Sequence, residues 1–296
     1  MLMVRLRHRL ALDDAALRGE IFREELTCGS LVIGRRFYVN KLLRQLDRVN
    51  CHATSGYSTT CDYTGLMSDA VTFRSYVKTI EDLSGPAGRL EALLNTGKEN
   101  ALYAALVAHP HPLGGGTMHN KVVYHAAKAF SSYGLPVLRF NFRGTGLSEG
   151  VHDEGRGEVD DVRVALNWLT VRYNLPILFA GFSFGSNVGL RACCGDPRVR
   201  GLVGLGLPVR AGGRDYTYNF LPGCGNVPKL FISGDHDEFS PRGVLESYLV
   251  AASEPKRIVW IEGADHFFAG TAQSPTFKLE GMSAALRLWL AESFGL

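Results

Sequence analysis

The chain has 296 residues, of which 46% are hydrophobic and 21% charged, and its formal net charge is +3. That composition is ordinary for a folded globular protein and excludes a largely disordered chain. The small charge does not indicate a nucleic-acid partner. No apolar run reaches the length of about 18 residues that a membrane span needs, so we expect no membrane partner either.

The first quarter of the chain shows no sustained strand or helix period. Weak patterns predict a helix over Leu10–Leu26 and a strand over Ser30–Val39. We interpret residues 1–75 as an N-terminal extension of unknown role, with partial disorder as one alternative. Residues 76–296 are then the domain that carries the function.

From residue 76 onward, apolar runs of strand length alternate with segments of helical spacing. The predicted strands are Leu90–Leu94, Ala101–Val107, Pro136–Phe142, Pro176–Phe182, Val199–Leu207, Lys229–Ser233 and Ile258–Glu262. The predicted helices are Lys121–Ser132, Val159–Tyr173, Ser186–Cys194, one that begins at the Ser240-Pro241 cap, and Met282–Phe294. Fully apolar strands separated by amphipathic helices predict an α/β fold, with a mostly parallel sheet covered on both faces.

The six cysteines give no sign of a metal site. None lies in a Cys-x-x-Cys pair, and none has a histidine at zinc-finger spacing. Cys193 and Cys194 are adjacent in an apolar helical stretch, where small buried thiols are common. The N-terminal residues lack the uninterrupted apolar core of a signal peptide, so we expect a reduced, cytoplasmic protein.

A Gly-x-Ser-x-Gly pattern over residues 181–185 lies between a predicted strand and a predicted helix. A serine on such a sharp turn projects its hydroxyl above the sheet, and glycines two residues to either side avoid backbone collisions. The helix that follows directs its free amides at the site, where they favour a developing oxyanion. An ordinary strand–turn–helix corner would also fit the letters, but the position makes Ser183 the candidate nucleophile.

A serine nucleophile needs a base, and two histidines follow later strands. The loops over residues 234–238 and 263–268 each leave the carboxyl end of a predicted strand, on the sheet edge where Ser183 is expected. We predict that His266 is the base, because it lies between the last strand and the final helix. His236 is the competitor.

The base in turn needs an acid that fixes its tautomer, and in chain order the acid should stand between Ser183 and His266. We prefer Asp237, with Asp235 and Glu238 as alternatives within the same turn. Asp265 is disfavoured because neighbouring side chains in an extended loop diverge.

The loop over residues 109–116 follows an early strand and is expected to complete an oxyanion hole. One amide should come from Phe184, the residue after the nucleophile. In the loop, prolines cannot donate, so Leu113 is the first choice for the second amide and His111 the next. Its glycine run lacks the Gly-Lys-Ser/Thr ending of a phosphate-binding loop, which disfavours that role.

Five ordered segments resemble a bacterial family of small α/β-hydrolases related to dienelactone hydrolases and small esterases. They are HPHPLGGGTMHNKVV at His109–Val123, LRFNFRGTGLSEG at Leu138–Gly150, GFSFGS at Gly181–Ser186, FISGDHDEFSP at Phe231–Pro241 and GADHFF at Gly263–Phe268. The resemblance covers about residues 75–296. It implies the eight-stranded α/β-hydrolase fold, a triad of Ser183, Asp237 and His266, and hydrolysis of esters or related acyl bonds without a metal or organic cofactor. Dienelactone hydrolases generally use cysteine as nucleophile, so a serine favours carboxylic esters.

Only about twenty residues, Pro208 to Val227, separate two strands at the place where many α/β-hydrolases insert a helical cap. We therefore predict little or no cap domain and an open site for small esters of short to medium acyl chains. The residues suggested as pocket walls are His111, Leu113, Phe184, Tyr218, Phe220 and Phe239.

Several alternatives stay open at this point. A peptidase, thioesterase or lactonase would use the same triad, and a non-catalytic protein of this fold would only bind a ligand. A homo-oligomer is also left open. Away from the triad, we expect Arg143 to tie loops together, and Glu158 and Asp161 to be helix-surface or capping groups.

Overall fold

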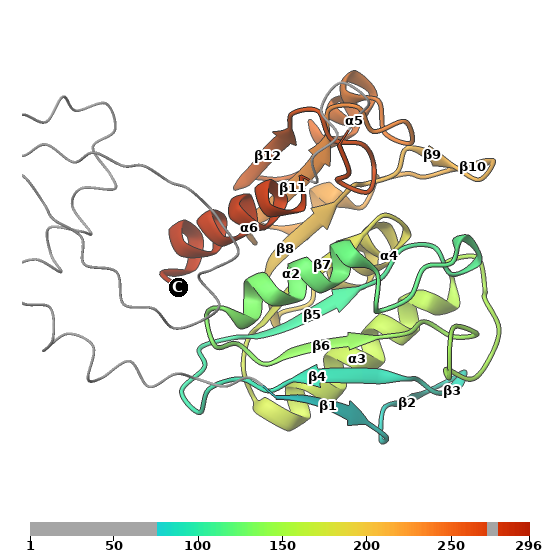
Figure 1. Ribbon diagram of the computed structural model, residues 1–296, viewed down its shortest axis with the longest axis vertical. Coiled ribbons are helices and arrows are strands. Elements are labelled where there is room, and N and C mark those ends of the chain that lie inside the picture. Colours follow the sequence, from blue (N-terminus) through green and yellow to red (C-terminus); the bar gives the residue numbers. More distant parts are fainter. Residues whose placement is uncertain (1–75, 271–277) are drawn as a thin grey trace, which may run out of the picture. The chain divides into compact units, whose positions relative to one another are not determined.

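The computed structural model describes residues 76–270 and 278–296 (Figure 1). The helix predicted over Leu10–Leu26 and the strand predicted over Ser30–Val39 lie outside these residues.

An eight-stranded sheet forms the centre of the described region. Its strands lie in the order β1 (Val77–Ile80), β4 (Ala92–Asn95), β6 (Val137–Phe140), β5 (Ala104–Ala108), β7 (Ile177–Phe182), β8 (Val199–Leu205), β11 (Lys229–Gly234) and β12 (Lys256–Ile261). β1 pairs antiparallel with β4, and β4 antiparallel with β6, while every pair from β6 to β12 is parallel. The predicted mostly parallel sheet is confirmed.

Helices cover both faces of this sheet, and each face has its own apolar core. α3 (Gly157–Tyr173), α4 (Phe184–Cys193) and α5 (Arg242–Leu249) contribute to one core. α2 (Lys121–Ser131) and α6 (Leu279–Phe294) contribute to the other and lie side by side over it (Figure 1). Every residue of β5 and β7 is buried, as expected for parallel strands between two helical layers.

The chain between β8 and β11 holds no cap domain. It forms the two-stranded hairpin β9 (Arg210–Ala211) and β10 (Arg214–Asp215), followed by the 3₁₀ turn η3 (Leu221–Cys224). A second small hairpin, β2 (Ser84–Gly85) and β3 (Gly88–Arg89), precedes β4. The prediction of little or no cap is confirmed.

Four helix starts differ from those predicted. α3 begins at Gly157 rather than Val159, and α6 at Leu279 rather than Met282. α4 begins at Phe184, directly after Ser183, rather than at Ser186. α5 begins at Arg242 with Pro241 at its N-cap, and the Ser240 side chain does not cap it. Ser240 Oγ donates instead to the carbonyl oxygen of Leu207 at 2.5 Å, which ties the start of α5 to the end of β8.

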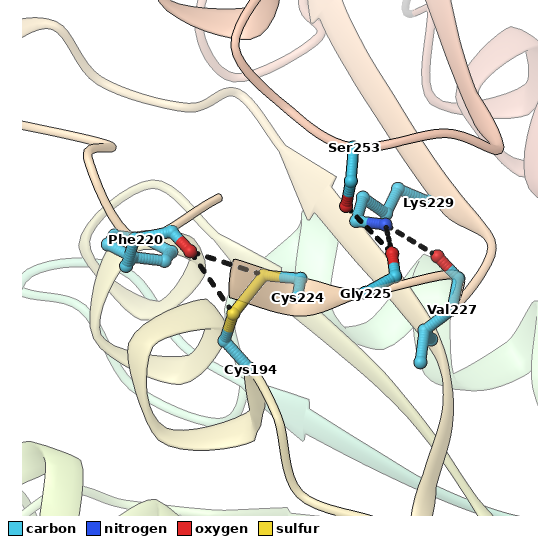
Figure 2. The surroundings of a disulfide bond; sticks show 7 residues. All are labelled: Cys194, Phe220, Cys224, Gly225, Val227, Lys229 and Ser253. Carbon is cyan, nitrogen blue, oxygen red and sulfur yellow. Dashed lines mark hydrogen bonds between the residues drawn. A yellow bond between two sulfur atoms is a disulfide. The ribbon is translucent and has the colours of Figure 1, made fainter. Parts of the chain in front are cut away.

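A disulfide joins Cys194, at the C-terminal end of α4, to Cys224 in η3, with 4.5 Å between their Cα atoms. Figure 2 shows the Phe220 carbonyl oxygen facing both sulfurs, at 3.3 Å from Cys194 Sγ and 3.8 Å from Cys224 Sγ. Beyond the bridge, Lys229 Nζ donates to the carbonyl oxygens of Gly225 and Val227, each at 2.8 Å. The expectation that the cysteines are reduced is wrong for this pair, since the two residues are brought together only by the fold.

No helix within the described ranges combines the length and the apolarity needed to cross a membrane.

Candidate active site

Ser183 stands on a strained turn between β7 and α4. Its φ of 55° and ψ of −121° place a non-glycine residue in a region that costs of order 1–3 kcal/mol. A Cβ on Gly181 would lie 2.4 Å from the Gly185 carbonyl oxygen, and one on Gly185 would lie 2.3 Å from the His109 carbonyl oxygen. Both glycines are therefore required for space, as the sequence pattern predicts.

Three side chains from separate loops form one continuous hydrogen-bonded chain. His266 Nε2 lies 2.9 Å from Ser183 Oγ, and His266 Nδ1 lies 2.8 Å from Asp237 Oδ2. All three residues are buried. A proton on Nδ1 satisfies the carboxylate and leaves Nε2 free to accept the serine hydroxyl proton, which is the tautomer that a general base needs.

The acidic residues near His266 differ in which groups their carboxylates contact. Asp237 Oδ1 accepts the Phe239 amide at 2.9 Å, which fixes its carboxylate toward His266. Asp235 Oδ1 instead accepts the Gly263 amide at 2.8 Å and lies 2.7 Å from Nδ1 of the exposed His236. Asp265 accepts backbone amides within its own loop. Of the acids weighed from the sequence, the structure brings Asp237 to the His266 ring.

The backbone amides of Phe184 and Leu113, the two predicted oxyanion-hole donors, differ in their surroundings. Phe184 is the first residue of α4, so its amide belongs to the helix start beside Ser183. Leu113 does not fit the role, because its amide donates to His111 Nδ1 at 3.2 Å and its side chain is 76% exposed. The turn that begins at Pro112 directs this amide back into its own loop.

His109, at the end of β5, anchors the same loop. Its Nδ1 donates to the Pro110 carbonyl oxygen at 2.7 Å, and its Nε2 accepts the Phe142 amide at 2.9 Å. Complete burial lowers the pKa of His109 to about 4, with a smaller contribution from the nearby His111. His109 is therefore a neutral structural ring, a role that its sequence position did not reveal.

A cavity of about 520 Å³ opens over Ser183 and His266. Its walls include His111, Leu113 and Phe239 from the predicted set. Phe184, Tyr218 and Phe220 are not among the lining residues, so the prediction is wrong for these three. Tyr218 is buried in the core, where its hydroxyl donates to the Pro208 carbonyl oxygen at 2.8 Å, and its ring lies 6.0 Å from that of Phe220.

Some residues in the cavity wall and in the loops around it differ from the sequence-based expectations. Arg214, from β10, and His152, from the loop before α3, line it, although neither was predicted to. Glu158 and Asp161 are completely buried, so they are not helix-surface groups. The capping alternative fits Glu158, whose carboxylate accepts the Asp153 and Gly155 amides just ahead of α3. Glu158 lies 2.7 Å from His152 Nδ1, and Asp161 pairs with Arg143, which ties loops together as expected. These contacts join residues that no sequence motif links.

Among residues 76–270 and 278–296, no three His, Cys, Asp or Glu side chains are grouped so as to hold a metal ion.

Comparison with known proteins places this geometry in a family. The model of the "Alpha/beta hydrolase domain" family matches residues 103–291. An uncharacterized protein from Rickettsia prowazekii is 35% identical over 216 residues, which cover 70% of this chain and 86% of that protein.

Solved structures agree with this assignment. An alpha-beta serine hydrolase homologue from Coxiella burnetii is 33% identical with a TM-score of 0.60, and the match covers 76% of this chain and 100% of that one. A serine hydrolase without lid from Xanthomonas campestris is 30% identical with a TM-score of 0.60, covering 74% of this chain and 94% of that one. The strand order, the serine turn and these matches together show that the chain belongs to the α/β-hydrolase family.

Proposed function

We propose that this protein is a serine hydrolase that cleaves carboxylic esters through an acyl-enzyme on Ser183. The observation that carries the proposal is the continuous hydrogen-bonded chain from Ser183 through His266 to Asp237. A protein that merely binds a ligand has no need to keep a strained serine in contact with an oriented histidine.

The reaction follows from the positions of these atoms. Ser183 Oγ attacks the ester carbonyl carbon while His266 Nε2 takes the hydroxyl proton, and Asp237 stabilises the imidazolium. The tetrahedral intermediate then collapses, the C–O bond to the alcohol breaks, and His266 returns the proton to the departing oxygen. In the second half, His266 takes a proton from water, the hydroxide attacks the acyl-enzyme, and the acid leaves as Ser183 regains its proton.

Two backbone amides are proposed to hold the oxyanion. One is that of Phe184, which stands at the positive end of α4. Because the Leu113 amide is engaged by His111 Nδ1, we assign the second position to the His111 amide, the alternative weighed from the sequence.

The substrate is proposed to be a small ester with a short to medium acyl chain. Within the described residues no cap domain lies between β8 and β11, and the cavity volume of about 520 Å³ falls in the lower half of the range for small-molecule pockets. The rings of Phe239 and Phe267 and the exposed Leu113 give part of its wall an apolar character. The Xanthomonas relative is described as lacking a lid, which supports the proposal of an open site.

Hydrolysis of p-nitrophenyl esters from acetate to palmitate tests the proposal, with Ser183→Ala as the comparison. We expect turnover of the shorter esters, a fall in rate toward palmitate, and a loss of about 10⁵–10⁶ in kcat for the variant. A fluorophosphonate should label the wild type and not Ser183→Ala. Labelling without ester turnover would point to peptides, thioesters or lactones, while a folded protein that is not labelled would indicate a binding function.

A further inference from the structure

One wall of the cavity carries three nitrogen-bearing side chains, His111, His152 and Arg214. The ring centroids of His111 and His152 lie 4.9 Å apart. Both rings pack on Phe184, at 4.8 Å and 5.6 Å, and Phe184 directly follows Ser183. The wall therefore adjoins the nucleophile and would face any substrate bound there.

The two histidines do not give this wall a free positive charge. His152 Nδ1 lies 2.7 Å from Oε1 of the buried Glu158, whose carboxylate also accepts the Asp153 and Gly155 amides at 2.8 Å each. Any charge on His152 is thus balanced by Glu158. The pKa of His111 is lowered, first by burial and then by the neighbouring His152 and Arg214, so this ring is neutral at physiological pH.

Arg214 differs from both histidines because its charge is permanent and has no carboxylate partner. Its Nη2 donates to the Glu154 backbone carbonyl oxygen at 2.6 Å, and its guanidinium lies 5.3 Å from the centre of the Tyr216 ring. No carboxylate oxygen of the described residues lies within 4.0 Å of it. By contrast Arg210, on the paired strand of the same hairpin, forms an ion pair with Asp215 at 3.3 Å.

A second guanidinium group, that of Arg191, adds positive charge beside Arg214. Arg191, on α4, donates to the Gly155 carbonyl oxygen at 3.2 Å, next to the Glu154 carbonyl that holds Arg214. Burial lowers the pKa of Arg191, and the charge of Arg214 lowers it further. Arg214 lines the cavity and Arg191 does not, but their charges repel each other, so an anion bound to Arg214 would stabilise both guanidinium groups.

We propose that Arg214 is a specificity-determining residue that binds a carboxylate on the ester substrate, so that the preferred substrates are anionic esters. This inference rests on the proposed function. A guanidinium presents a planar fork of donors that matches a carboxylate, and the backbone carbonyl and the Tyr216 ring already hold this one in place. Glu154 also lines the cavity, and its charge favours a singly charged partner over a phosphate dianion.

Three probes of similar size test the assignment. 4-Nitrophenyl butyrate is neutral, mono-4-nitrophenyl glutarate carries a carboxylate on the acyl side, and 4-carboxyphenyl butyrate carries one on the alcohol side. For Arg214→Gln, the ratio of kcat/KM for an anionic probe to that for the neutral probe should fall by about tenfold or more. The loss should appear mainly in KM, because the contact is made equally in the ground state and the transition state. Arg214→Lys should keep part of the preference.

Arg210→Gln is the matched control, because it removes one charge from the same hairpin at a residue outside the cavity lining. It should leave the ratio at the wild-type value. An unchanged ratio for both anionic probes in Arg214→Gln would overturn the assignment while neutral ester turnover upheld the proposed function. If Arg210→Gln lowered the ratio as much as Arg214→Gln, a general field rather than a subsite would be responsible. Failure of the wild type on all three esters would overturn both proposals.

Discussion

The carboxylate of Asp237 differs from that of Asp235 in which group each one orients. Asp237 faces His266 Nδ1, whereas Asp235 holds the Gly263 amide and His236. Asp237→Asn keeps the shape but presents an amide that can hold the wrong tautomer of His266, so kcat should fall by about 10⁴. Asp235→Asn is the matched control and should keep most of the wild-type kcat. Steady-state kinetics of both variants check this, and an equal loss in the two would contradict the assignment of Asp237.

His109 makes the free energy of unfolding depend on pH. Its pKa of about 4 in the folded protein lies below the ordinary 6.5, so the unfolded chain binds more protons between these values. This contribution to stability is complete above pH 6.5 and is lost as the pH falls toward 4. Between pH 7 and pH 5, the loss from this group should be about 2 kcal/mol.

Urea denaturation at the two pH values measures this loss. His109→Asn should be less stable than the wild type at pH 7, because the bond to the Phe142 amide is weakened, but it should lose less stability on going to pH 5. An NMR titration of the His109 ring gives the folded pKa directly. Equal losses in wild type and variant would show that other groups produce the pH dependence.

At the scale of elements, the disulfide links the C-terminal end of α4, the helix that follows Ser183, to the segment after the β9–β10 hairpin. The bridge closes a loop of 30 residues, which corresponds to about 3–4 kcal/mol of stabilisation in the chain-entropy model. Cys224→Ser should lower the free energy of unfolding by this amount. Adding a reductant should destabilise the wild type similarly and leave Cys224→Ser unchanged. A wild type insensitive to reductant would show that the bridge does not contribute.

The sequence predicts an element well where the element is buried on both sides. β5 and β7 are entirely apolar and entirely buried, so the sequence indicates both strands as continuous apolar runs. β1 was missed because three of its four residues are exposed, and β9 and β10 because two-residue strands have no period to detect. Short edge and hairpin strands depend on their partners rather than on their own residues.

The same distinction applies to the site. Ser183, Asp237 and His266 each follow the carboxyl end of a predicted parallel strand, so chain order was enough to bring them together. The place of Arg214 in the cavity wall and the contact between His152 and Glu158 depend on how the β9–β10 hairpin and the loop before α3 fold over the sheet, which no local pattern specifies. The contact of the Leu113 amide with His111 Nδ1 could not be predicted for the same reason, since the turn sets the direction of that amide.

At the scale of the whole molecule, the described residues contain all the parts that the proposed chemistry uses. The sheet, its two apolar cores and the chain from Ser183 to Asp237 all lie within residues 76–296. The Coxiella relative is matched over 100% of its length by 76% of this chain. About a quarter of this chain therefore has no counterpart in the Coxiella structure.

We accordingly predict that a chain beginning at Phe73, where one compact unit starts, folds and hydrolyses the same p-nitrophenyl esters as the full chain. Starting there keeps Tyr76, whose amide and carbonyl both bond to Thr96 and extend the pairing of β1 with β4. Thermal unfolding and kcat/KM of the two chains give the comparison, with the full-length Ser183→Ala variant as the inactive reference. If the shorter chain is folded but inactive, the first 72 residues take part in the reaction or in substrate binding. If it does not fold, they complete a core that the described residues leave unfinished.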